Sequence, residues 1–191
     1  MKHTIFLLIG FSWLAGCQAT SYHYTQKLQQ AHWALQSGRI EQAQKLLAEA
    51  SSIASDKEIT ETVEAPLLQA ELLLAKGDLE EALATIKSVQ SRPDVDSLDT
   101  ARVEEILGKI ALRQGNFKEA QEHLLIAEKS YPQQKDQLRV ADLVILVRGL
   151  TAYGKGDLKV AQRYWQSISN VEMRHAIDQV VQDTKNVADN R

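Results

Sequence analysis

The sequence predicts an all-α fold made of about four helix–turn–helix repeats, closed at its C-terminal end by one further helix. The commonest residue types, among them Ala, Leu, Gln, Glu and Lys, favour helices, and only three prolines occur in 191 residues. No sustained apolar–polar alternation bounded by turn residues indicates a strand. One short pattern also recurs at a nearly constant interval.

The recurring pattern is a glycine followed two residues later by an apolar residue and five residues later by an alanine. Its glycines stand at positions 38, 77, 115 and 156, so the successive steps are 39, 38 and 41 residues. Glycine ends a helix in the left-handed conformation at the least cost. The alanine allows two helices to approach closely. The pattern therefore predicts paired helices joined by tight turns.

This pattern resembles the tetratricopeptide repeat, a helix–turn–helix unit of 34 residues, over roughly residues 23–168. The resemblance implies a right-handed superhelix whose first helices line a concave groove. The period is four to seven residues longer than that of the family, and aliphatic residues replace most of the usual aromatics in the first helices. The small position early in each first helix holds Ala31, Ala70, Gly108 and Gly149; the large apolar position of each second helix holds Leu47, Ile86, Leu124 and Trp165; the small position after it holds Ala50, Val89, Ala127 and Ile168.

The helices expected from this pattern cover 22–37, 39–54, 57–76, 78–91, 96–114, 116–130, 135–154 and 157–168. Pro66 either kinks the third helix or marks its true start. Asp78, Asn116 and Asp157 follow turn glycines, and we expect each to cap the helix after it.

A last helix is expected over about 170–187, because Ile177, Val180, Val181 and Val187 form one apolar stripe. The ends of repeat arrays expose apolar edges that need covering, so this helix is predicted to be a cap. A soluble, fully folded protein after deletion of 170–191 would contradict that prediction.

The first residues have the order of an export signal. Lys2 and His3 precede an apolar run over 5–14, and small residues lead to Cys17. The run is about a dozen residues long, shorter than the roughly 20 that a membrane-spanning helix needs. Residues 14–17, Leu-Ala-Gly-Cys, resemble the bacterial lipobox. The resemblance implies cleavage of residues 1–16 and lipid on Cys17, with 17–22 as a spacer and 23–191 as the repeat domain.

Gln18 follows the cysteine, whereas an Asp there tends to retain lipoproteins at the inner membrane in enteric-type bacteria. We therefore expect a lipid-anchored protein of the outer membrane, facing the periplasm. Cys17 is the only cysteine, so its acylation would exclude disulfides and cysteine chemistry. Loss of Lys2 changes the net charge from −3 to −4, which gives no electrostatic case for nucleic acid.

Motifs for catalysis are nearly absent. The sequence has no phosphate-binding loop, His-Glu-x-x-His or Gly-x-Ser-x-Gly motif. Adjacent carboxylates such as Glu104 and Glu105 point about 100° apart on a helix and do not converge for acid–base work. We expect no enzyme activity, no cofactor and no metal. The histidines after the signal, His23, His32, His123 and His175, lack ligand spacing.

A binding surface is the remaining candidate site. The resemblance places on the groove side Glu71 of the second repeat and Arg102, Glu105, Lys109, Leu112 and Arg113 of the third. Such a basic row suits an acidic or C-terminal peptide, and a salt-bridged surface without a partner is the alternative. Reversing Lys109 and Arg113 to Glu is expected to abolish partner capture without unfolding. The groove row of the fourth repeat is apolar throughout, and either the last helix or a partner covers it, with the last helix favoured.

Together these features predict a membrane-anchored scaffold for a protein partner, in assembly of a pilus, secretion or other envelope complex. The chain looks like the class that includes pilotins of type IV pili and tight-adherence secretion lipoproteins. One alternative is an adaptor of peptidoglycan hydrolases or other envelope enzymes. Another is a glycan- or small-molecule-binding module, which is disfavoured because Trp33 and Trp165 are both expected at repeat-packing positions. Function cannot follow from the fold alone.

Overall fold

A computed structural model describes residues 5–56, 60–131, 137–171, 173–174, 177–179 and 182. Every regular element within these ranges is a helix, which confirms the all-α prediction. The chain divides into two compact units, Met1–Lys76 and Gly77–Arg191. Each unit is described by itself.

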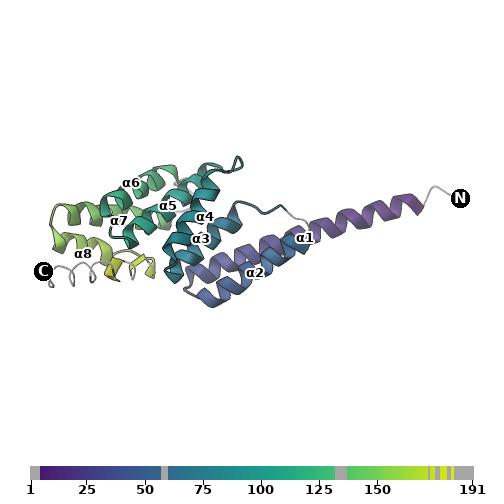
Figure 1. Cartoon of the computed structure of the whole chain (residues 1–191), viewed down its shortest axis with the longest axis horizontal. Coiled ribbons are helices and arrows are strands. Elements are labelled where there is room, and N and C mark those ends of the chain that lie inside the picture. Colours follow the sequence, from purple (N-terminus) through teal and green to yellow (C-terminus); the bar gives the residue numbers. More distant parts are fainter. Residues whose placement is uncertain are drawn as a thin grey trace. The chain divides into compact units, whose positions relative to one another are not determined.

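The first unit contains α1 (Ile5–Gln36), α2 (Ile40–Asp56) and α3 (Glu64–Lys76). In Figure 1, α2 turns back beside the C-terminal part of α1, and α3 contacts both helices. Their buried side chains form one apolar cluster that includes Leu28, Leu47 and Leu68. Helix α1 begins earlier than expected, because it runs through 17–22, the stretch predicted as a spacer.

The second unit contains α4 (Leu79–Gln90), α5 (Ser97–Arg113), α6 (Phe117–Ser130), α7 (Gln137–Gly154) and α8 (Leu158–Gln166). Each of these helices packs against the next one along the chain (Figure 1). A second apolar cluster, with Leu124, Leu146 and Trp165 among its members, joins α5, α6, α7 and α8. The helix pairs predicted for the third and fourth repeats, α5 with α6 and α7 with α8, are thus present.

The turns between paired helices have the predicted conformation. The four turn glycines have positive φ angles: 66° at Gly38, 89° at Gly77, 77° at Gly115 and 82° at Gly156. At Gly115 the backbone N–H bonds to the Leu112 carbonyl at 3.0 Å, and the next N–H bonds to the Ala111 carbonyl at 2.9 Å. This double bond pattern closes a helix that ends in a left-handed residue. The repeat alanines Ala43, Ala82, Ala120 and Ala161 are each 0% exposed.

Small residues in the first helices make room for large residues in the second helices. A Cβ atom added at Gly149 of α7 would lie 2.1 Å from the Nε1 atom of Trp165 on α8. One added at Gly108 of α5 would lie 2.6 Å from the Cγ atom of Leu124 on α6. Both contacts are too close for any side chain, so the small–large pairing of the repeat determines how closely these helices approach.

The helix starts follow the sequence only in part. Asp157 caps α8 as expected, since its carboxylate accepts a bond from the Val160 N–H at 3.3 Å. Asp78 and Asn116 make no side-chain cap bond, so those two predictions are wrong. Pro66 lies in the first turn of α3, where the missing N–H costs nothing, and it therefore marks the start of that helix.

A cap that the sequence analysis missed begins α5. The Asp96 carboxylate accepts a bond from the Asp99 N–H at 2.8 Å, and the Asp99 carboxylate accepts one from the Asp96 N–H at 3.4 Å. The two aspartates form a reciprocal capping box.

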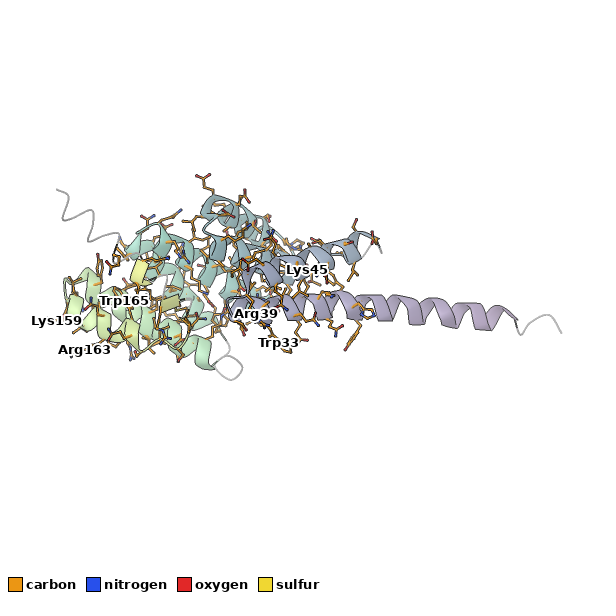
Figure 2. All side chains as sticks on the ribbon, turned by 90° about the horizontal axis from the view of Figure 1, so that it is seen from below. Trp33, Arg39, Lys45, Lys159, Arg163 and Trp165 are labelled. Atoms are coloured by element: carbon orange, nitrogen blue, oxygen red, sulfur yellow. The ribbon has the colours of Figure 1, made fainter. Side chains whose placement is uncertain are left out.

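The two tryptophans of the repeat region have different environments. Trp165 is 4% exposed and packs in the core, as predicted. Trp33 is 57% exposed, so the expectation that it occupies a packing position is wrong. In Figure 2 its side chain projects outward from α1. A glycan- or small-molecule-binding module was disfavoured because both tryptophans were expected at packing positions, and the exposure of Trp33 removes part of that reason.

The predicted last helix is described only in part. Residues 173–174, 177–179 and 182 are helical, and Met173 and Ile177 are 5% and 1% exposed. Both belong to the same apolar cluster as Leu143 and Leu146 of α7. Met173 and Ile177 thus share a buried cluster with the face of α7 that the sequence predicted would need cover. The other predicted stripe residues, Val180, Val181 and Val187, lie outside the described residues.

Candidate functional site

The predicted groove row of α5 is largely inside the protein. Glu105 is 1% exposed, Leu112 is 2% exposed and Arg102 is 7% exposed. Lys109 and Arg113 are half-buried. The expectation that this row forms an open surface is therefore wrong for its three buried members, and its role in partner binding stays a prediction. Glu71, the predicted groove residue of the second repeat, is half-buried on α3 in the first unit.

Glu105 is the centre of a buried polar cluster that ties three parts of the second unit together. Its carboxylate accepts a hydrogen bond from the Tyr131 hydroxyl at 2.7 Å. It also pairs with the Lys109 ammonium at 2.6 Å and with the Arg139 guanidinium of α7. The Arg139 guanidinium lies 5.5 Å from the centre of the Tyr131 ring. The cluster therefore links α5, the end of α6 and α7.

The charges of this cluster fix its protonation. Burial alone would raise the pKa of Glu105, but the neighbouring Lys109 and Arg139 charges outweigh burial and hold this pKa well below its usual range. Burial, with the Glu105 charge next, raises the pKa of Tyr131 above its usual range. At neutral pH Glu105 is therefore a carboxylate and Tyr131 a neutral phenol. Their contacts hold α5, α6 and α7 together.

The C-terminal segment lies over the same unit and is attached by a second buried carboxylate. Asp142 of α7 is 5% exposed, and its two oxygens accept bonds from the N–H groups of Ser169 at 2.7 Å and Asn170 at 2.9 Å. The Asn170 side chain then accepts a bond from the Met173 N–H at 2.9 Å. Asp142 thus fixes the place where the chain turns back toward α7.

The same segment reaches the predicted row on α5. The Arg113 guanidinium donates a bond to the Gln179 side-chain oxygen at 3.5 Å. The described residues of the C-terminal segment thus contact α5 at Arg113, and Met173 and Ile177 belong to the apolar cluster that includes residues of α7. The sequence favoured cover by the last helix, and the described residues agree with that choice.

Lys109 cannot serve as the simple surface probe that the sequence suggested. A glutamate at position 109 would face the buried Glu105 carboxylate, from which the Lys109 ammonium is 2.6 Å away. Two carboxylates in that place would repel each other and destabilise the second unit. The expected loss of partner capture without unfolding therefore does not hold for this substitution. Arg113, with one long contact at the surface, is the better probe.

A metal site needs several ligand side chains close together. Within the described residues, no three His, Cys, Asp or Glu side chains lie together as a metal site. The His123 Nδ1 atom is 2.7 Å from a Glu104 oxygen, and this pair joins α5 to α6 as a structural contact. Among the same residues, no helix is both long enough and apolar enough to cross a membrane.

An exposed aromatic face on α1 is the feature that the sequence analysis missed. Tyr22 is 66% exposed and Trp33 is 57% exposed, and both lie on the side of α1 away from its buried residues. The signal that could have found this face is the spacing of 11 residues, which brings two positions of a helix to within about 20° of each other.

Comparison with known proteins agrees with the repeat architecture. The family model described as a tetratricopeptide repeat-like domain matches residues 14–141. No curated protein and no solved structure shows a significant match. The matched range extends from α1 into α7 and covers more than half of the 191 residues. Domains of this family are typically scaffolds for protein interaction, and the chain belongs to the tetratricopeptide repeat-like domain family.

Proposed function

We propose that this protein is a lipid-anchored scaffold of the outer membrane that faces the periplasm and holds a protein partner in assembly of a pilus, secretion or other envelope complex. The observation that supports this proposal is that one helix contains both the lipobox cysteine and the start of the repeats. Cys17 and the first buried repeat residue, Tyr24, belong to the same helix, α1. A lipid on Cys17 would therefore keep the repeat domain within a few turns of helix of the membrane.

The use of buried polar groups in the second unit supports a binding role over a chemical one. Three of these groups, Glu105, Tyr131 and Asp142, make hydrogen bonds that hold parts of the unit together. Proteins of this kind bind through shape and surface chemistry, with affinity concentrated in a few contact residues. The second candidate function is that of an adaptor for peptidoglycan hydrolases or other envelope enzymes, which would use the same kind of surface.

The anchor is tested by the mass of the protein purified from cell membranes. We expect the N-terminal peptide of the mature protein to begin at Cys17 and to carry diacylglycerol and a further acyl chain. Two or more chains are needed for stable anchoring, because one buried chain gives only marginal binding. Cys17→Ser should remove the lipid and release the protein from the membrane fraction. A wild-type protein that keeps residues 1–16 without lipid would overturn the proposal.

The scaffold role is tested by crosslinking in intact cells. A photoreactive residue replaces Arg113 in one strain and the exposed Lys45 of α2 in another. We expect at least one position to capture a defined envelope protein from wild-type cells, and the Cys17→Ser variant to lose that product. Capture by neither position, with the lipidated protein present at normal level, would argue against a protein-binding scaffold on these surfaces.

A further inference from the structure

The face of α1 that carries Tyr22 and Trp33 is turned away from the rest of the first unit. Tyr24, Leu28, Ala31 and Leu35 form the opposite, buried face, with exposed fractions between 0% and 4%. At about 100° per residue, positions 22 and 33 lie within about 20° of each other, and the buried positions lie roughly on the far side. Helix α1 is thus amphipathic, with its core side occupied by α2 and α3.

The chemistry of this face is aromatic at both ends and uncharged between them. Gln26 and Gln29 lie between Tyr22 and Trp33, and both are exposed. Tryptophan and tyrosine have a large apolar body and a polar tip, so they are favoured where one side is apolar and the other is wet. These two residue types are enriched at the level of lipid headgroups. The face therefore has the composition of a membrane-interface contact.

The charge distribution of the chain supports the same partner. Residues 1–40 contain no aspartate or glutamate, although the chain has 25 of them, so all 25 lie in 41–191. In the anchored protein, which begins at Cys17, the cationic residues before position 41 are Lys27, whose ammonium pairs with Glu49 of α2 at 2.6 Å, and Arg39. Arg39 is exposed in the turn directly after α1. A face without acidic groups is not repelled by anionic headgroups, and the exposed Arg39 is attracted to them.

We propose that the Tyr22–Trp33 face of α1 lies against the lipid bilayer in the anchored protein. This inference rests on the lipid at Cys17 that the proposed function assigns. From Cys17 to Trp33 is 16 residues, which at 1.5 Å per residue is about 24 Å of helix. The headgroup region on each side of a bilayer is only about 5–8 Å deep. Both aromatics therefore reach it only when α1 lies along the membrane surface.

A helix held in this way has a function beyond attachment. A lipid at the first residue alone leaves the repeat domain free to swing about its anchor. Contact through Tyr22 and Trp33 removes that freedom and fixes which side of the first unit faces the periplasm. The buried face of α1 carries α2 and α3, so these helices are turned away from the membrane. The partner then meets one defined orientation of the scaffold.

The test uses tryptophan fluorescence with brominated lipid, which quenches only tryptophans that reach the bilayer. The lipidated protein is purified from membranes and placed in vesicles of phosphatidylglycerol and a phosphatidylcholine brominated on its acyl chains. The lipidated protein begins at Cys17 and so has only Trp33 and Trp165. One variant carries Trp165→Phe, so that Trp33 is the only reporter, and the matched control carries Trp33→Phe, so that the buried Trp165 is the only reporter.

We expect brominated vesicles to reduce the Trp33 emission relative to unbrominated ones and to leave the Trp165 emission unchanged. A third variant carries Lys45→Trp with phenylalanine at positions 33 and 165. Its reporter is exposed on α2, because the Lys45 side chain is 79% exposed. It should be quenched much less than Trp33. Equal quenching at both positions would mean general closeness to the membrane and would overturn the proposed contact.

The outcomes separate this inference from the anchor itself. Unquenched Trp33 in a protein whose mass shows lipid on Cys17 would overturn the membrane contact and leave the anchor in place. A Trp33 emission that changes with protein concentration or with added peptidoglycan fragments, and not with bromination, would assign the face to a second copy or to a glycan. Absence of lipid on Cys17 would remove the anchor, and this inference with it.

Discussion

Replacing Glu105 by Gln is the sharpest test of how the second unit is held together. The wild-type carboxylate is 1% exposed and contacts the Tyr131 hydroxyl, the Lys109 ammonium and the Arg139 guanidinium. Glutamine keeps the volume of the side chain and one acceptor oxygen. It removes the negative charge, so two cations lose their partner. The substitution therefore measures the charge of the cluster separately from its packing.

The expected cost follows from the exposure of the two cations. Removing one partner of a fully buried ion pair costs about 3–5 kcal/mol. The Lys109 and Arg139 side chains are 24% and 23% exposed, so water can reach them and recover part of this cost. We expect Glu105→Gln to lower the free energy of unfolding of the second unit by about 2–3 kcal/mol. For a protein of this size the melting temperature would fall by about 5–10 °C.

The effect should also depend on pH in a defined direction. Because the pKa of Glu105 is depressed in the folded state, its contribution is complete above its unfolded pKa of about 4.3 and is lost as the pH falls through the folded pKa. The stability difference between wild type and Glu105→Gln should therefore stay constant from neutral pH down to about pH 5. It should shrink below about pH 4, because the unfolded wild-type chain then takes up a proton at Glu105 that the folded protein does not bind.

The assay is urea unfolding followed through Trp165, the buried tryptophan of the second unit, with Trp13 and Trp33 replaced by Phe. Glu122→Gln is the matched control, since Glu122 is exposed on α6 and should change stability by less than about 0.5 kcal/mol. A Glu105 variant as stable as this control at neutral pH would refute the role of the cluster. A difference that grows on acidification would refute the assigned protonation.

Three further predictions concern packing and the C-terminal segment. Gly149→Ala should destabilise the second unit by about 2–3 kcal/mol in urea unfolding, because the added Cβ atom would clash with the Trp165 ring. Gly154→Ala is the matched control: its Cβ atom would have no neighbouring atom within 4 Å, so this variant should be neutral or slightly stabilising. Asp142→Asn should increase amide exchange in the C-terminal segment, measured by mass spectrometry, while exchange in α5 stays slow; equal exchange in both proteins would contradict its anchoring role. Deletion of 170–191 should expose apolar surface of α7, seen as increased dye binding and earlier thermal unfolding, and a soluble, fully folded truncated protein would rule out the cap.

The repeats could be predicted because their determinants are local and recur. Gly115 is needed at its turn for a positive φ, and Ala120 is needed five residues later for close approach, whatever surrounds the pair. The pairing of Gly149 with Trp165 follows from the same register. A period of this kind therefore gives the helices and their partners without knowledge of the tertiary structure.

The candidate site was predicted less well, because a repeat pattern gives the direction of a face and does not show what covers it. Glu105 and Leu112 point to the groove side in the family pattern, yet they are buried in this chain. Glu105 contacts the distant residues Tyr131 and Arg139, and Gln179 contacts Arg113 of the same row. The spacing of the residues within α5 does not predict any of these contacts.

Trp33 was mispredicted for the opposite reason. A packing position in a repeat is buried by a neighbouring repeat, and a terminal helix lacks a neighbour on one side. None of the described helices covers the side of α1 that carries Trp33, so this side is exposed. The same exposure makes Trp33 available for a contact outside the chain.

The position of the C-terminal segment also bears on how a partner would bind. A partner that binds the α5 row must first displace this segment. The partner's apparent affinity is then its intrinsic affinity multiplied by the fraction of molecules in which the row is open. Asp142→Asn loosens the segment without touching the row, so it should strengthen such a partner's binding. Arg113→Glu should weaken it in the same experiment. A partner that binds elsewhere would respond to neither change, and the predicted site on Arg102, Lys109 and Arg113 would then be wrong.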